Sequence, residues 1–269
     1  MNSIPTYSGT GVLTGAAHLL AGSPGQDYAL SGVGEASSWG VVCDGCSNGG
    51  PDVGLGAGAL AKVVATRLSA PTAMSFLAGT TASVGAQLAQ DLLPWDNLLG
   101  WENLLATAVM ARREGNWLTF RMFGDGGFAL FHRDGSLSLY RGFYENNAPD
   151  YLAYRLMPDW HAGLEDEPRL WVNAYSSTDQ TTLELARMAR PDPVWHFNTD
   201  SSGICGYALF TDGAESLRAL SPMAVLLSVV AKKAAEMTIA QALGACSQEW
   251  LNEGTYPTDD LAIAMTLWA

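Results

Sequence analysis

Aspartates occur in four short segments that lie far apart along the chain and share a similar setting. The segments are Gly25-Gln26-Asp27, Cys43-Asp44-Gly45, Thr211-Asp212-Gly213 and Asp259-Asp260. In three of them the aspartate stands at the end or the start of an apolar, strand-like run. Such a residue is badly placed for packing in a core. It is well placed to direct its carboxylate into a pocket shared with other segments.

Carboxylates that converge repel one another unless a cation neutralises them, and hard oxygen ligands suit Mg²⁺ or Mn²⁺. Each segment taken singly is also consistent with an ordinary turn, because Asp-Gly is among the commonest turn pairs. Taken together, their order and their strand contexts predict a metal site assembled from distant parts of the chain.

The elements that must position these aspartates follow from the hydrophobic pattern. Residues 28–33 and 39–43 are predicted to form neighbouring strands joined by a turn rich in Gly and Ser. Apolar residues then recur at helical spacing over residues 52–68. The Gly-rich stretch 49–58 lacks the Lys-Ser/Thr of a phosphate-binding loop. We interpret it as a tight loop that leads into a closely packed helix.

A second helix is predicted over residues 78–92, with Pro94 ending it and residues 95–102 forming a connection. Hairpin turns then separate four short strands, at residues 104–112, 117–123, 127–132 and 137–141. The remaining predicted elements are weaker strands at 151–157 and 170–175, a buried strand at 206–211, helices at 222–233 and 238–252, and a closing strand at 262–268.

This order of elements predicts an α+β fold with four layers, α-β-β-α, in which two antiparallel sheets are flanked by helices. A chain of 269 residues with 48% hydrophobic residues has ample material for one such core. The sequence contains no convincing linker and no internal repeat. We therefore expect a single domain over residues 1–269.

The charge balance excludes some classes of partner. The chain carries 14 basic and 27 acidic residues, which gives a formal net charge of −13. Binding to a phosphate backbone or to an anionic membrane depends on Lys and Arg. We therefore expect no nucleic-acid partner and no membrane partner, whereas a cation-binding site is compatible with this charge.

We also expect a cytoplasmic protein. The first seven residues lack the basic start and apolar run of a secretory signal. The longest apolar run, residues 223–231, is far too short to span a bilayer. Cys43 and Cys46 have the spacing of a zinc knuckle or a redox pair, but Cys205 and Cys246 are isolated and a loop follows Cys46. We interpret all four cysteines as free thiols.

The acidic segments and their order resemble the protein phosphatase 2C (PP2C) family of metal-dependent Ser/Thr phosphatases. The first segment, His18-Leu19-Leu20-Ala21-Gly22-Ser23-Pro24-Gly25-Gln26-Asp27, is similar to the divergent bacterial branch of that family. The first motif of this branch has a His followed by Gly-x-Pro-x-Gln-Asp. The resemblance runs from about residue 18 to residue 268 and is loose between residues 144 and 197.

The resemblance implies a role for each matching aspartate. Asp44 would bridge two metal ions, and the carbonyl of Gly45 would bind one of them. Asp212 and Asp259 would complete the site of the first ion. Asp125, in Gly124-Asp125-Gly126, would help to hold a weak third ion, although a plain hairpin turn is an equal alternative there.

Three departures from the family pattern concern the second metal ion and the substrate phosphate. Gln26 replaces the usual glutamate ligand, so Asp27 would orient waters beside the second ion. The Arg that binds phosphate in many members is missing, and His18 is the nearest substitute. His18 could bind the phosphate or protonate the leaving alkoxide, and a capping or packing role is the alternative. Ala262 stands where a Thr or Ser often occurs.

The implied activity is that of a phosphoprotein phosphatase that depends on two Mn²⁺ or Mg²⁺ ions and hydrolyses phosphoserine or phosphothreonine with a metal-activated water. The implied partners are a phosphorylated protein substrate and a cognate Ser/Thr kinase, and we expect a monomer. One alternative is a catalytically silent phosphatase fold that serves as a binding or regulatory module. Another is a phosphatase that acts on a small metabolite.

Overall fold

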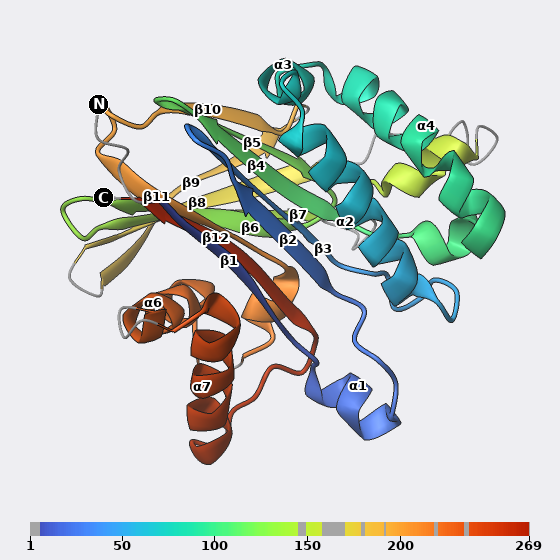
Figure 1. The fold of residues 1–269 in the computed structure, drawn as a ribbon. Coiled ribbons are helices and arrows are strands. Elements are labelled where there is room, and N and C mark those ends of the chain that lie inside the picture. The colour runs from blue at the N-terminus through green and yellow to red at the C-terminus, as the bar shows by residue number, and fades with distance from the viewer. Residues whose placement is uncertain are drawn as a thin grey trace.

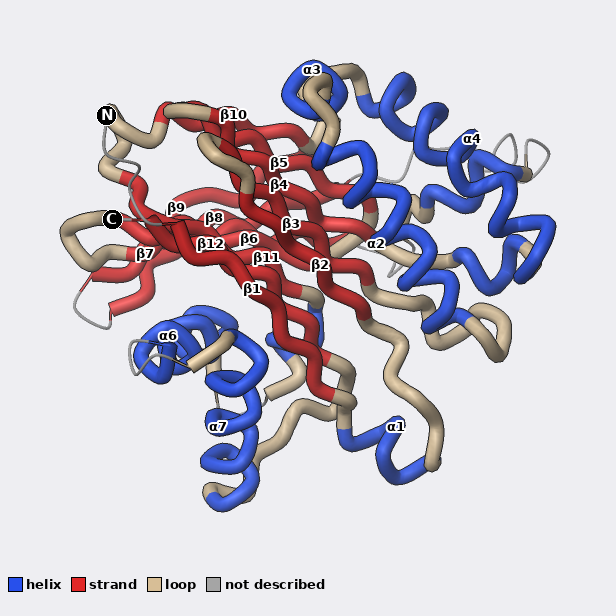
Figure 2. Tube along the Cα trace, in the orientation of Figure 1, coloured by secondary structure: helices blue, strands red, loops and turns tan. Residues whose placement is uncertain are grey.

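Two antiparallel sheets pack face to face in the computed structural model, and helices cover their outer faces (Figures 1 and 2). The structure describes residues 6–144, 149–157, 170–178, 181–190, 192–217, 220–233 and 237–268. The predicted four-layer α+β architecture is thereby confirmed.

The larger sheet has seven strands, in the order β1 (Thr6–Leu13), β12 (Leu261–Trp268), β11 (Ile204–Phe210), β6 (Gly126–His132), β7 (Leu137–Tyr144), β8 (Leu170–Thr178) and β9 (Thr181–Arg190). The smaller sheet has five, in the order β10 (Val194–Asn198), β5 (Trp117–Phe123), β4 (Ala108–Glu114), β3 (Ser37–Cys43) and β2 (Tyr28–Val33).

Separate groups of helices cover the two sheets, as Figure 1 shows. The smaller sheet is covered by α2 (Val53–Ser69), α3 (Ala73–Leu77) and α4 (Thr81–Leu99). The larger sheet is covered by α6 (Pro222–Lys233) and α7 (Ile239–Asn252). The short helix α1 (Ala16–Ala21) lies at one end of the sandwich. The described residues also form three 3₁₀ turns: η1 (Trp101–Leu104), η2 (Leu152–Leu156) and η3 (Asp212–Glu215).

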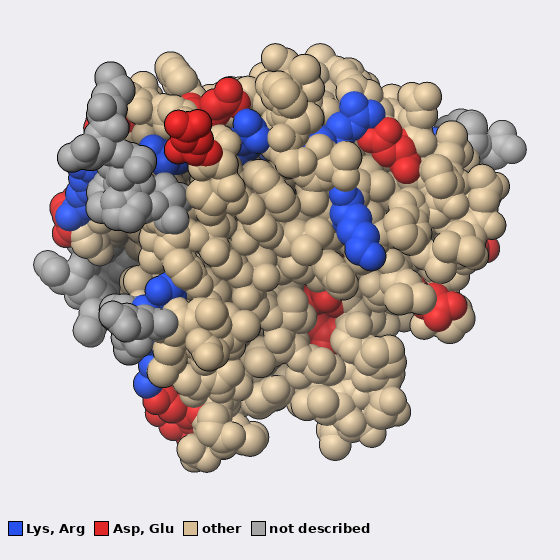
Figure 3. All heavy atoms as spheres, in the orientation of Figure 1, with Lys and Arg blue, Asp and Glu red and all other residues tan. Residues whose placement is uncertain are grey.

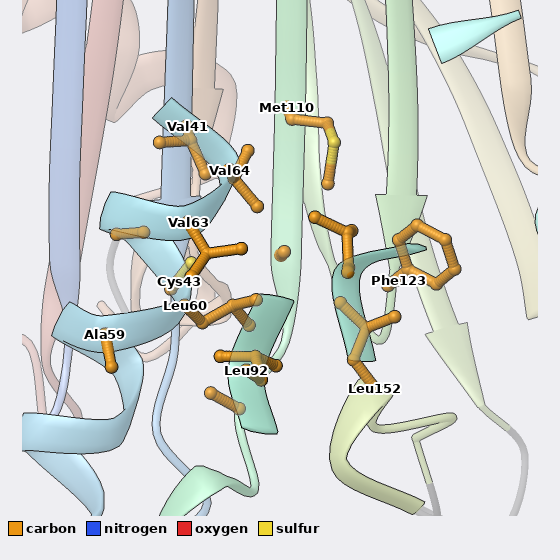
Figure 4. Packing of buried hydrophobic residues seen from close by; sticks show 14 of the residues in the cluster. Val41, Cys43, Ala59, Leu60, Val63, Val64, Leu92, Met110, Phe123 and Leu152 are labelled. Carbon is orange, nitrogen blue, oxygen red and sulfur yellow. The ribbon is translucent and has the colours of Figure 1, made fainter. Parts of the chain in front are cut away.

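Central strands are buried on both faces, which explains their unbroken apolar sequences. In β12, Ile263 and Met265 pack toward α6 and α7, whereas Ala262 and Ala264 pack between the sheets. These two groups belong to two hydrophobic clusters, one beneath α6 and α7 and one between the sheets. A third hydrophobic cluster fills the space between the smaller sheet, α2 and α4 (Figure 4). Because successive side chains of a strand point to opposite faces of the sheet, one strand contributes residues to two hydrophobic clusters.

Tight packing of α2 against η1 confirms the interpretation of the Gly-rich stretch. A Cβ atom at Gly56 would lie only 1.6 Å from the carbonyl oxygen of Asn103. The Asn103 side chain in turn accepts a hydrogen bond of 2.8 Å from the backbone N–H of Asp52, just before the helix. Only a glycine at position 56 allows α2 to lie this close to the backbone of η1.

The predicted end of the second helix at Pro94 is wrong, because α4 continues to Leu99. Gly100, with a φ of +82°, follows the last helical residue. Proline removes one hydrogen bond from a helix interior. The helix nevertheless continues past Pro94, because the partly buried side chains of Trp95 and Leu99 pack against the hydrophobic cluster that includes residues of α2. Tertiary packing here outweighs the local helix-breaking signal.

The predicted strand over residues 151–157 is also wrong, because this segment contains η2. Leu152 and Ala153 are adjacent in sequence and both are buried beneath α4, whereas a strand would send them to opposite faces. Predicted strand 104–112 begins later, at Ala108, because η1 occupies its start.

Sequence patterns did not indicate β1, β9, β10, α1 or α3. Strand β1 is interrupted by glycines and hydroxyl side chains, and it lies at the edge of the larger sheet, paired with β12. The four cysteines are free, as expected. Across the described ranges, no helix has both the length and the apolar character to cross a membrane. Charged side chains are sparse on the face in Figure 3.

Candidate active site

Pairing of the strands brings the predicted aspartates to one end of the sandwich. In the smaller sheet, Tyr28 lies opposite Cys43, so Asp27 and Asp44 are neighbours at the adjoining ends of β2 and β3. In the larger sheet, Phe210 is paired with both Ile263 and Gly127. The segments that carry Asp212, Asp259 and Asp125 therefore meet at one end of that sheet.

A cleft of about 590 Å³ lies at this end of the sheets. Four aspartates from four distant segments line it, namely Asp44, Asp125, Asp212 and Asp259. Gly45 lines it as well, directly after Asp44. The structure therefore brings together five of the seven residues predicted for the site, and Asp27 and His18 do not line the cleft.

Asp27 lies behind Asp44 and is held by a buried threonine. The hydroxyl of Thr211 donates a hydrogen bond of 2.6 Å to Oδ2 of Asp27 and accepts one of 2.9 Å from the backbone N–H of Ala262. The carboxyl groups of Asp44 and Asp27 also share a hydrogen bond. No local pattern singled out Thr211, which precedes Asp212 and connects β11, β12 and the first acidic segment.

Burial and mutual repulsion make this cluster hard to ionise. Burial, followed by the nearby charges of Asp260 and Asp212, raises the pKa of Asp27 to about 8. Burial and the charges of Asp125 and Asp259 raise the pKa of Asp212 to about 7. Burial, together with the charge of Asp27, holds the pKa of Asp44 well above its usual range. The protein on its own therefore does not balance these negative charges.

One cation lies near enough to act on the cluster. The charge of Arg141, on β7, lowers the pKa of both Asp125 and Asp212, although burial still raises both on balance. The Arg141 guanidinium forms an ion pair with Glu215 on η3, three residues after Asp212. Arg141 lies far from the four acidic segments in sequence, so no local pattern indicated it.

Asp260 holds the first acidic segment in place and does not line the cleft. It is buried and accepts hydrogen bonds from the backbone N–H groups of Gly15, at 2.7 Å, and of Gln26. His18 Nδ1 lies 2.9 Å from Asp260 Oδ1. This placement favours a positioning role for His18 over direct contact with a phosphate. The Gln26 side chain accepts a hydrogen bond of 3.0 Å from Ser47, which lines the cleft.

The donor set of the cleft fits divalent cations. Four carboxylates and a backbone carbonyl supply hard oxygen ligands, and burial together with neighbouring charges raises the pKa of Asp44, Asp125 and Asp212. Within the part of the chain that is described, no three Asp, Glu, His or Cys side chains are close enough together to hold one ion. Water would have to complete the coordination, as is usual for Mg²⁺.

The crowded carboxyls predict that the metal-free protein loses stability as pH rises. Asp27 and Asp212 keep their protons to about pH 8 and 7 in the folded state but release them near pH 3.8 in the unfolded chain. The folded state thus binds more protons between these values. The free energy of unfolding should fall by up to about 1.4 kcal/mol per pH unit and group.

Urea unfolding in EDTA at pH 5 to 8 measures this slope, and adding Mn²⁺ at pH 8 should raise the midpoint by neutralising the charges. A metal-free stability that rises over this pH range would contradict the assignment of a buried carboxylate cluster whose negative charge is only partly offset.

Searches for similar proteins identify the fold. A scan against protein-family models finds no match, and a search of curated proteins finds none. Solved structures do match, and over nearly the whole chain. A variant of a bacterial serine phosphatase matches with a TM-score of 0.59 and 11% identity over 100% of both chains.

Two further matches are also Ser/Thr phosphatases. Stp1 from Staphylococcus aureus has a TM-score of 0.56 and 10% identity over 98% of this chain and 94% of its own. The catalytic domain of PstP, solved with two manganese ions, has a TM-score of 0.53 and 16% identity over 98% of both chains. The chain therefore has the fold of the PP2C-type Ser/Thr phosphatases.

Proposed function

We propose that this chain is a metal-dependent phosphatase that hydrolyses phosphoserine or phosphothreonine in proteins. The observation that carries the proposal is the convergence of Asp44, Asp125, Asp212 and Asp259 on one cleft of a phosphatase fold. These carboxylates come from four separate segments, and among the described residues the charge of Arg141 offsets their negative charge only in part. A pair of divalent cations would supply the remaining positive charge.

In this proposal Asp44 would be a ligand shared by two cations, and the carbonyl of Gly45 would be a further oxygen ligand. Asp212 and Asp259 would help to hold the first cation, with water filling the remaining positions, and Asp125 would help to hold a weaker third ion. Mn²⁺ and Mg²⁺ both suit such oxygen ligands. When bound, the ions supply an activated water as nucleophile and neutralise charge on the phosphoryl oxygens.

The protein contributes the positions of these ligands. Thr211 directs Oδ2 of Asp27 by donating a hydrogen bond to it, and Asp27 in turn contacts the Asp44 carboxyl. Ionised, Asp27 accepts hydrogen bonds from Thr211 and from waters beside Asp44. Asp260 and His18 position the first segment from behind. The physiological substrate would be a phosphoprotein, paired with a cognate Ser/Thr kinase.

Hydrolysis of p-nitrophenyl phosphate tests the proposal. We expect turnover with Mn²⁺ or Mg²⁺ and its complete loss with excess EDTA, because the carboxylates by themselves repel a phosphate dianion. Restoring Mn²⁺ after EDTA should restore the rate. A wild-type protein that is folded but inactive across metals and pH would overturn the proposal and favour a binding module.

A further inference from the structure

The cleft contains a second, aromatic group of lining residues that the proposed metal chemistry does not use. This aromatic wall consists of Trp101, Tyr151 and Tyr154. Trp101 begins η1, whereas Tyr151 and Tyr154 belong to the segment that forms η2. An aromatic surface beside a phosphoryl site is suited to contact the part of a substrate that flanks its phosphate.

Contacts behind the aromatic wall hold it rigidly. The rings of Tyr151 and Tyr154 pack edge to face, with centroids 5.5 Å apart. Next to them, Arg155 donates hydrogen bonds of 2.9 and 2.7 Å to the two oxygens of Asp150. The guanidinium of Arg155 also lies over the ring of Phe123, at 5.6 Å.

Helix α4 supports this arrangement from the outside. A Cβ atom at Gly85 would lie 2.6 Å from Nε of Arg155, so any larger residue at this position would require the arginine side chain to shift. The aromatic wall is therefore in place before any ligand arrives. A preformed surface of this kind loses little conformational entropy on binding.

The charge of the cleft favours a cationic neighbour of the phosphate. Exposed Glu102 lines the cleft beside Trp101, in addition to the four aspartates. Among the described residues that line the cleft, none is Lys, Arg or His. The formal charge of the whole chain is −13. Ions bound at the aspartates would leave Glu102 as the remaining negative group for the rest of the substrate.

We infer that the cleft selects phosphorylated peptides that carry an arginine close to the phosphoserine or phosphothreonine. This inference rests on the proposed phosphatase function. A planar guanidinium can stack on an aromatic face and at the same time pair with a carboxylate. The aromatic wall and Glu102 provide these two partners. Acidic flanking residues would be repelled by the same groups.

A matched set of phosphopeptides tests the inference with the wild-type protein and Mn²⁺. The peptides differ only in one residue, which is Arg, Lys, Ala or Glu, placed in turn at each position flanking the phosphoserine. For at least one position we expect kcat/KM about tenfold higher with Arg than with Ala, intermediate with Lys and lowest with Glu. The difference should lie mainly in KM.

Glu102→Gln should reduce the Arg-over-Ala ratio of kcat/KM about fivefold. Hydrolysis of p-nitrophenyl phosphate, which has no flanking residue, measures any general effect of the lost charge. Glu35→Gln is the matched control. Glu35 is exposed in the β2–β3 turn, at the end of these strands away from the cleft. It should alter neither measurement.

The outcomes separate this inference from the proposed function. A wild-type protein that, with Mn²⁺, hydrolyses neither p-nitrophenyl phosphate nor any of the peptides would overturn the proposed function. Normal hydrolysis of p-nitrophenyl phosphate with equal kcat/KM for the Arg, Ala and Glu peptides would overturn only the inference. An Arg preference that survives Glu102→Gln undiminished would overturn the role of Glu102, and with it the pairing on which the inference depends.

Discussion

Asp44→Asn should lower the rate of p-nitrophenyl phosphate hydrolysis by a factor on the order of 10³ or more, because it removes the charge that would hold two cations at once. The amide has nearly the same shape as the carboxyl, so the fold should persist. The same substitution should raise the melting temperature of the metal-free protein, because a neutral amide avoids the cost of burying a carboxylate and the repulsion from Asp27.

Two measurements on one variant therefore move in opposite directions. Activity disappears, the metal-free melting temperature rises by a few degrees, and the stabilisation by added Mn²⁺ shrinks. Asp134→Asn is the control. Asp134 is exposed in the β6–β7 turn, and asparagine keeps the oxygen that accepts a hydrogen bond from Ser136. Near-normal activity of Asp44→Asn would show that Asp44 does not bridge metals.

Asp260→Ala should lower the free energy of unfolding by about 3–5 kcal/mol, because each buried donor that loses its acceptor costs about 1–3 kcal/mol. The alanine leaves the backbone N–H groups of Gly15 and Gln26 without their acceptor and His18 without its carboxylate. These contacts join chain segments about 240 residues apart. We expect the loss as a lower urea midpoint, with activity reduced in parallel because the first acidic segment shifts.

The adjacent residue provides the comparison. Asp259 is exposed and lines the cleft, so Asp259→Ala should change the free energy of unfolding by less than about 1 kcal/mol. It should instead raise the Mn²⁺ concentration that gives half-maximal activity. If Asp259→Ala proved the more destabilising of the two variants, the division between a positioning Asp260 and a metal-contacting Asp259 would be wrong.

Local chemistry in the sequence was enough to predict the layered fold and the place of the acidic segments. Strands such as β3 and β12 are apolar on both faces, so their ends were recognisable where Asp44 and Asp259-Asp260 interrupt the pattern. An aspartate directly beside a buried strand has little choice of position. It must lie at the end of the sheet, and antiparallel pairing then brings these ends together.

Local signals misled where packing outweighed them. Pro94 was predicted to end a helix, but burial of Trp95 and Leu99 carries α4 five residues further. The segment of residues 151–157 looked like a strand because of its apolar residues, yet it wraps beneath α4 as a 3₁₀ turn. In both cases the decisive contacts come from elements that are distant in sequence.

The sequence by itself therefore determined the sandwich and which aspartates could meet, because hydrophobic periodicity and strand ends are local properties of the chain. Only the tertiary structure decided what surrounds them. In the folded protein Thr211 donates a hydrogen bond to Asp27, the charge of Arg141 acts on Asp212, and His18 contacts the carboxyl group of Asp260. Each of these pairs joins residues that are about 70 to 240 positions apart. No local pattern encodes such contacts, because they arise only when the two sheets and their connecting segments pack together.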